Sequence, residues 1–227
     1  MASRPRAIGI PGVIFALALL STLPVLWRVV LPMADGRAWP QHAPHLPIVL
    51  VHAAGGLAML VLGAAALYIG WTRKAFRRHR WFGYSYLILG GTGAIAALVV
   101  SFQAPHEPRS LYIATGTLAA VWLAVAGMAY RAARNKRFDS HREWMVRSYV
   151  LSWTFVGCRL ATLYNFYPWL GEEGTTAAIW VNWIVPLVLC EIALRWREGG
   201  RLRPSAAATS GPRGTGGAAA ASPTRSG

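Results

Sequence analysis

Long uninterrupted runs of apolar residues are the feature of this sequence that most limits what it can fold into. A helix of about 20 apolar residues is long enough to cross the hydrocarbon core of a bilayer. Six such runs can be counted, at about 8–32, 46–70, 82–103, 110–130, 146–168 and 177–196. Charged residues make up only 14% of the chain, whereas about a quarter is usual in soluble domains. The sequence therefore predicts an all-α, polytopic integral membrane protein with six transmembrane helices.

The six runs leave little room for a folded domain outside the membrane, so we expect one membrane domain over residues 1–198. The first run follows the basic stretch MASRPR but is longer than the apolar region of a signal peptide. We interpret it as a retained helix, bent at Pro11 or Pro24. Residues 199–227 consist almost entirely of Gly, Ala, Ser, Pro, Thr and Arg, which predicts a disordered cytoplasmic tail.

The distribution of positive charge predicts the orientation of the spans. If the N-terminus is cytoplasmic, the inner segments hold 19 Lys and Arg residues, the outer segments hold three, and Arg159 lies within a span. Such an asymmetry is typical of bacterial membrane proteins whose N- and C-termini are both cytoplasmic. The net charge of +15 is thus an orientation signal that also favours anionic lipid at the inner face, and it does not indicate a nucleic-acid partner.

A repeated motif occupies the inner loops. The pattern K-x-F-x-x-H-R occurs at 74–80 and again at 136–142, so each of its residues recurs 62 positions later. An outer histidine precedes each copy, His52 for the first and His106 for the second. Two tandem hairpins of the same orientation would be related by a pseudo-twofold axis along the membrane normal. We therefore expect the second to fifth spans to form a pseudo-twofold four-helix core.

The four histidines are candidate cofactor ligands. In this core, His52 and His106 would be symmetry mates near the outer face, and His79 and His141 near the inner face. Two pairs of facing imidazoles are what two b-type haems, one above the other, require as axial ligands. Three arginines are candidate partners of the haem propionates or of another anion: Arg80, Arg142 and Arg159. Arg159 must find an anion or carbonyl groups because it lies within a span.

An alternative interpretation of the motif requires no cofactor. The estimated starts of the third and fifth spans place His79 and His141 in the loops that enter them, at the level of the lipid headgroups. His and Arg side chains at that level bind phosphate, and neighbouring aromatic residues form an interfacial belt. Residues of such a belt would be Trp81, Phe82, Tyr84, Tyr86, Trp144 and Tyr149. His106 lies between Pro105 and Pro108, as an ordinary loop histidine would.

Three further polar or sulfur-containing features have structural interpretations. Glu191 precedes Arg195 by four residues, the spacing of an ion pair on one helix. Asn182 precedes Pro186 by four residues, where the missing amide frees a backbone carbonyl. The two cysteines fall in different spans and are interpreted as small buried apolar residues. The motifs of nucleotide hydrolases, serine hydrolases and common zinc enzymes do not occur in the sequence.

The elements HRWFGYSY at 79–86 and HREWMVRS at 141–148, with His52 ahead of them, carry a family resemblance. Over about residues 45–197 the chain resembles an uncharacterised bacterial family of predicted membrane proteins, a domain of unknown function. This resemblance implies a polytopic fold and no established activity. In the order of its histidines, the chain is also similar to di-haem cytochromes of the b561 type. That likeness implies pairing across alternate helices, His52 with His106 and His79 with His141.

These observations favour a b-type haem protein that transfers electrons in the cytoplasmic membrane. One alternative is a haem-free membrane protein that binds a lipid or a small ligand, or that acts as an accessory subunit. A transporter of a small solute or metal is a further alternative, although the spans contain few carboxylates.

Overall fold

The computed structural model describes residues 9–35, 44–72, 76–103, 109–166 and 168–202. These residues form helices and connecting turns, without a strand among them. The chain divides into two compact units, residues 1–191 and residues 192–227. In the second unit, the described part is the final stretch of a helix that ends at Leu202. This helix therefore includes the first residues of the segment for which we predict a tail, and 203–227 lie outside the described residues.

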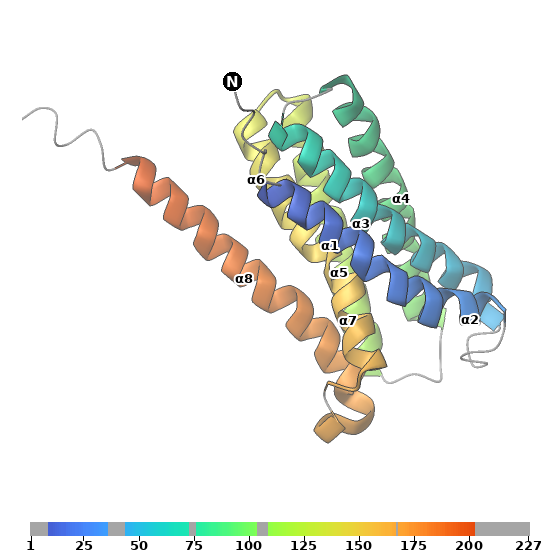
Figure 1. Cartoon of the computed structure of the whole chain (residues 1–227). Coiled ribbons are helices and arrows are strands. Elements are labelled where there is room, and N and C mark those ends of the chain that lie inside the picture. Colours follow the sequence, from blue (N-terminus) through green and yellow to red (C-terminus); the bar gives the residue numbers. More distant parts are fainter. Residues whose placement is uncertain (1–8, 36–43, 73–75, 104–108, 167, 203–227) are drawn as a thin grey trace, which may run out of the picture. The chain divides into compact units, whose positions relative to one another are not determined.

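The helices follow one another along the chain as shown in Figure 1. Their bounds are α1 (Ile10–Val25), a π-helical turn (Leu26–Val30), α2 (Leu31–Ala34), α3 (Leu46–Thr72), α4 (Phe76–Gln103), α5 (Arg109–Arg134), α6 (Phe138–Ser152), α7 (Thr154–Leu163), a 3-10 segment (Pro168–Glu173) and α8 (Gly174–Leu202). The π-helical turn begins two residues after Pro24, which removes one backbone donor from the helix.

Five helical segments of the described chain are long and apolar enough to cross a membrane. They are Gly12–Ala34, Leu46–Thr72, Arg77–Gln103, Arg109–Arg134 and Gly174–Trp196. The other predicted span, 146–168, corresponds to α6 and α7, which follow each other across the single residue Trp153. The prediction of an all-α, multi-pass membrane protein is confirmed.

Two helices begin earlier than hydropathy indicates, and this changes the position of the repeated motif. α4 begins at Phe76 and α6 at Phe138, so His79 and His141 are each the fourth residue of a helix. The expectation that they lie in loops was wrong. Hydropathy reports where the apolar environment begins, whereas Arg is a good helix former that extends the helix into the basic region.

Helices α3 to α6 form a four-helix core, in which α3 packs along α4, α4 along α5, and α5 along α6. Its buried side chains include Leu60, Tyr86, Trp122, Ala129, Met145 and Tyr149. The hydroxyl groups of Tyr86 and Ser148, which are 62 residues apart, are 2.5 Å from each other. The rings of His79 and His141, also 62 residues apart, face each other as well. Residues at equivalent positions of the repeat thus meet between α4 and α6, which places the approximate twofold axis there.

The contact of α3 with α4 depends on two glycines. A Cβ atom at Gly55 would lie only 2.7 Å from the Cα atom of Gly93 and from the carbonyl oxygen of Leu89. Backbone cannot move aside as a flexible side chain can, so close packing of these helices requires glycine.

We expect Gly55→Ala to force the two helices apart and to lower the free energy of unfolding by about 1–3 kcal/mol, the usual cost of overpacking. The measurement is the Tm of the purified protein in detergent. Gly91→Ala is the matched control, because a Cβ atom there would meet nothing within 4 Å. Equal Tm values for the two variants would contradict this account of the α3–α4 contact.

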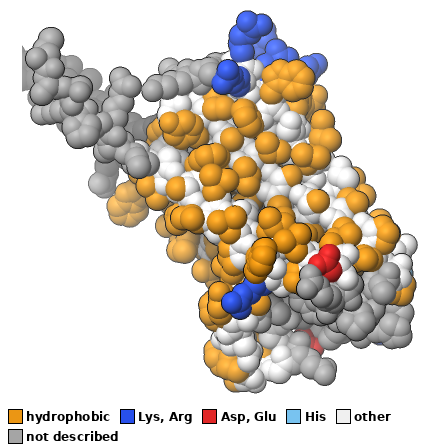
Figure 2. Space-filling model, turned by 45° about the vertical axis from the view of Figure 1, so that its right-hand side comes forward, with side chains coloured by type: hydrophobic (Ala, Val, Ile, Leu, Met, Phe, Trp, Pro, Cys, Tyr) orange, Lys and Arg blue, Asp and Glu red, His pale blue; other side chains and the backbone are white. Residues whose placement is uncertain are grey.

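The surface of the first unit is typical of a protein surrounded by lipid. Figure 2 shows hydrophobic side chains over much of the middle of one face and Lys and Arg side chains gathered at its upper end. Large apolar side chains exposed on α8 include Val181, Val185, Val188 and Leu189. We call the end at which α4 and α6 begin the inner end, following the charge asymmetry of the sequence.

Candidate functional site

At the inner end of the core, the imidazoles of His79 and His141 face each other. Their ring centres are 6.4 Å apart and the ring planes are inclined at 87°. Each ring is held by the helix that precedes its own: Nδ1 of His79 lies 3.0 Å from the carbonyl oxygen of Ala66 on α3. Nδ1 of His141 lies 2.9 Å from the carbonyl oxygen of Ala129 on α5. The two halves of the repeat therefore hold their histidines in the same way.

These hydrogen bonds determine the tautomer of each ring. A carbonyl oxygen can only accept, so Nδ1 must donate, and in the neutral imidazole the lone pair is then on Nε2. Histidines that bind metals are usually held in this way, because the outer hydrogen bond orients the ring and makes the ligating nitrogen more basic. Gly70 makes room for the arrangement, since a Cβ atom there would lie 3.1 Å from Cε1 of His79.

The pair offers two imidazoles that could hold one metal-containing group. In this structure the two rings meet edge to face, with their centres 6.4 Å apart. Across the described residues, no group of three or more His, Cys, Asp or Glu side chains is arranged to hold a metal ion. A zinc site takes three or four protein ligands, whereas haem iron takes its equatorial ligands from the macrocycle. The donor set therefore fits haem better than a protein-only metal site.

One turn after His79 on α4 lies Gly83. Its equivalent in the repeat, Met145, follows His141 by four residues. A Cβ atom at Gly83 would meet no atom within 4 Å, so a side chain could be added there without a clash.

Further into the bundle, a buried hydrogen-bond network links α4, α5 and α6. The hydroxyl of Tyr86 lies 2.5 Å from Oγ of Ser148 and 3.0 Å from Oγ of Ser152. Ser152 donates to the carbonyl oxygen of Ser148 and accepts from Nε1 of Trp122, each over 3.0 Å. Because the Ser152 proton is committed to that carbonyl, Tyr86 donates to Ser152 and accepts from Ser148. All these polar groups are thereby satisfied in the middle of an apolar bundle.

This network corrects part of the aromatic-belt interpretation. Tyr86 and Tyr149 are core residues, with 0% and 4% of their surface exposed. The hydroxyl of Tyr149 donates to the carbonyl oxygen of Leu60 over 3.1 Å. Trp81 and Tyr84, by contrast, are exposed as the interfacial interpretation requires. Tyr86 is buried whereas Trp81 and Tyr84 are exposed because they lie on different faces of α4. Only the face that carries His79 and Tyr86 points toward α6.

The structure describes one member of the predicted outer pair. His52 lies on α3, with Nδ1 3.1 Å from the carbonyl oxygen of Gly93, and its ring meets Phe155 edge-on at a centroid distance of 5.8 Å. His106 lies outside the described residues, so the pairing of His52 with His106 remains a prediction.

The three predicted anion-binding arginines lie in different places. Arg80 is exposed at the inner end, and Arg142 is an exposed residue whose guanidinium lies 4.0 Å from the carboxylate of Asp139. Arg159 is partly buried on α7, four residues before that helix ends at Leu163. It is therefore closer to the outer end of its span than to the middle, because the helix ends five residues earlier than the predicted span.

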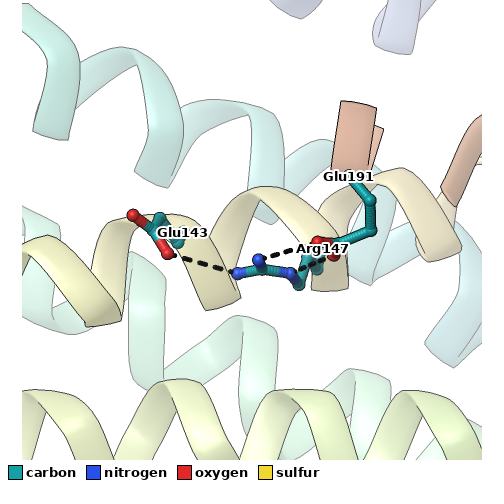
Figure 3. A network of polar contacts seen from close by, with 3 residues as sticks. All are labelled: Glu143, Arg147 and Glu191. Atoms are coloured by element: carbon teal, nitrogen blue, oxygen red, sulfur yellow. Dashed lines mark hydrogen bonds and ion pairs between the residues drawn. The ribbon is translucent and has the colours of Figure 1, made fainter. Parts of the chain in front are cut away.

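An ion pair within the spans, which the sequence analysis did not find, links α6 to α8 (Figure 3). Nε and Nη2 of Arg147 donate to the two carboxylate oxygens of Glu191, the second over 3.1 Å. Nη1 of Arg147 also lies 3.6 Å from the carboxylate of Glu143, one turn earlier on α6. Only 12% of the Arg147 side chain is exposed. The final arginine of HREWMVRS is the available signal in the sequence, because Arg147 falls inside the predicted span 146–168.

The proline of α8 is accommodated by a contact between helices. Pro186 cannot donate to the carbonyl oxygen of Asn182, and Oγ1 of Thr154 on α7 donates to that oxygen instead, over 3.2 Å. The Asn182 side chain donates to the carbonyl oxygen of Ala178 over 2.8 Å and occupies the place of a side chain at Gly157. The prediction of a freed carbonyl was right, but its partner comes from the neighbouring helix.

Comparison with known proteins identifies a family of membrane proteins, but it does not identify an activity. The family described as "Predicted membrane protein (DUF2306)" matches residues 49–194, more than half of the 227 residues. No curated protein and no solved structure matches the chain. The matched range includes His52, both copies of the HR element, Arg147 and Glu191.

Proposed function

Because the chain belongs to the DUF2306 family of predicted membrane proteins, we propose a function that operates within a bilayer, as a b-type haem protein that carries electrons in the cytoplasmic membrane. The facing imidazoles of His79 and His141 are the observation that carries this proposal. Their separation, their matching hydrogen bonds and their position on alternate helices of the core all suit the two axial ligands of one haem.

When bound, haem supplies one-electron chemistry, and the protein residues control its position and surroundings. His79 and His141 would hold it from α4 and α6, while Ala66 and Ala129 keep both rings oriented through their carbonyl groups. The Tyr86 network limits how far the site extends into the bundle. The two histidines are partly buried at the inner end of the core, and the degree of burial is one of the means by which a protein adjusts a reduction potential.

A second haem, between His52 and His106 near the outer face, remains part of the proposal. Transfer of electrons from one face of the membrane to the other would use this outer pair together with the inner pair. Arg80 and Arg142 are near the inner histidines in sequence and remain the proposed partners of the inner propionates.

Contact with anionic lipid is the partner interaction that we propose at the inner end. Basic side chains exposed there are Arg77, Arg78, Arg80, Arg131, Arg134, Lys136, Arg137 and Arg142. Each cation near an anionic membrane surface adds about 1 kcal/mol of attraction. This cluster supports an inner face that rests against anionic headgroups.

The direct test is the absorbance spectrum of the protein purified in detergent from haem-replete cells. We expect a coloured preparation with a dithionite-reduced difference spectrum of a bis-histidine b-type haem. A pyridine haemochrome assay should give about one haem per chain if only the inner pair is loaded, and about two if the outer pair is also loaded. A folded but colourless preparation would overturn the proposal and leave a haem-free membrane protein as the alternative.

A further inference from the structure

Near the outer end of the core, α7 packs against His52 through Phe155, and Arg159 follows Phe155 by one helical turn. The ring of Phe155, one turn before Arg159 on α7, meets the ring of His52 at 5.8 Å. It also occupies the space that a side chain at Gly56 would need, so this face of α7 points toward α3. Residues four apart share a helix face, so Arg159 lies on the face of α7 that carries Phe155 against His52.

Arg159 differs from the other arginine held within the spans. Arg147 has two carboxylates, Glu191 and Glu143, whereas the Arg159 guanidinium forms no ion pair or side-chain hydrogen bond within the described part of the chain. The whole sequence holds only eight acidic residues. A guanidinium remains charged at any ordinary pH, so an anion is a favourable partner for Arg159 at the outer end of an apolar span. The Arg159 side chain is only partly buried, so part of it is accessible from outside the core.

His52 adds a second type of hydrogen-bonding group. Its Nδ1 donates to the carbonyl oxygen of Gly93, so in the neutral ring Nε2 is an acceptor. Arg159 offers a fork of donors, which matches the oxygens of a phosphate. A donor fork beside an acceptor suits a phosphate that still carries a proton, such as hydrogen phosphate or a phosphomonoester.

We propose that Arg159 and His52 form an exchangeable oxyanion site that binds a phosphate group at the outer end of the core. The phosphate comes either from a lipid headgroup or from a free solute. This site is separate from the His79/His141 pair and does not depend on the haem proposal for the inner end. Because it uses Nε2 of His52, it is an alternative to the outer haem and not an addition to it.

The test is a titration of the full-length protein in maltoside detergent, whose headgroup contains no phosphate. Inorganic phosphate and short-chain phosphatidic acid are added separately at constant ionic strength, and the Tm is measured. We expect one of them to raise the Tm of the wild type in a saturable manner, because a ligand of the folded state stabilises it. Stabilisation by inorganic phosphate identifies a free solute as the source, and stabilisation by phosphatidic acid alone identifies a lipid headgroup.

Arg159→Gln should weaken the response about tenfold or more, because it removes the charge-assisted hydrogen bonds. Arg109→Gln is the matched control, since Arg109 is an exposed cation at the outer end of α5, and its response should equal that of the wild type. His79→Ala should also respond like the wild type, which separates this site from the inner one. Arg159→Lys keeps the charge and should retain a weaker response even if Arg159→Gln does not fold.

Three results would overturn the proposal. The first is that neither ligand stabilises the wild type, and the second is that the response survives in Arg159→Gln. The third is that Arg159→Gln loses a haem in the pyridine haemochrome assay, since the guanidinium would then bind a propionate instead of an exchangeable phosphate.

Discussion

His79→Ala is expected to lower the haem content by about one equivalent per chain, because loss of one axial ligand leaves the inner haem held from one side only. His141→Ala should have the same effect, since the two rings are held by equivalent carbonyl groups of α3 and α5. The measurement is the pyridine haemochrome assay of each purified variant, normalised to the amount of folded protein. Added imidazole should restore part of the lost absorbance in both variants by occupying the position of the missing ring.

His45→Ala is the matched control for both variants. It makes the same substitution in the turn before α3, away from the repeated motif, and should leave the haem content at the wild-type value. If His79→Ala and His141→Ala both fold and both retain the wild-type haem content, the two residues are not ligands. Their hydrogen bonds to Ala66 and Ala129 would then serve only to pack α4 against α3 and α6 against α5.

Arg147→Met is expected to destabilise the fold by about 3 kcal/mol, toward the lower end of the range for breaking a buried ion pair, because the Glu191 side chain is 39% exposed. The substitution keeps much of the side-chain volume but leaves Glu191 without the bidentate partner that links α8 to α6. The measurement is the Tm in detergent, together with limited proteolysis of the segment that leads into α8. Release of α8 should make that segment more susceptible to cleavage.

Two further variants make this result interpretable. Arg134→Met removes an exposed cation at the same inner end and should change stability by no more than about 0.5 kcal/mol. Combining Arg147→Met with Glu191→Leu should recover much of the lost stability, since a buried ion pair can often be replaced by apolar side chains. If Arg147→Met and Arg134→Met have the same Tm, the ion pair contributes no more than a surface charge does.

The helices, the multi-pass character and the family were accessible from the sequence because they depend on local composition. Runs such as 46–70 and 110–130 are apolar over their whole length, and any arrangement of them must satisfy the backbone internally as helices. The repeat of His79 at His141, 62 residues later, predicted the tandem hairpins. The starts of α4 and α6 were missed because hydropathy does not report how far a basic helix extends beyond the apolar core.

The meeting of particular side chains was decided by the tertiary structure alone. Tyr86 resembles an interfacial residue in the sequence, and only the rotation of α4 toward α6 places its hydroxyl against Ser148. Arg147 and Glu191 are 44 residues apart, and no local pattern indicates that the helices carrying them bring these charges together. Apolar runs determine that helices form and cross the membrane. Which faces meet depends on the packing of small residues and on polar groups finding partners between helices, and both are properties of the assembled bundle.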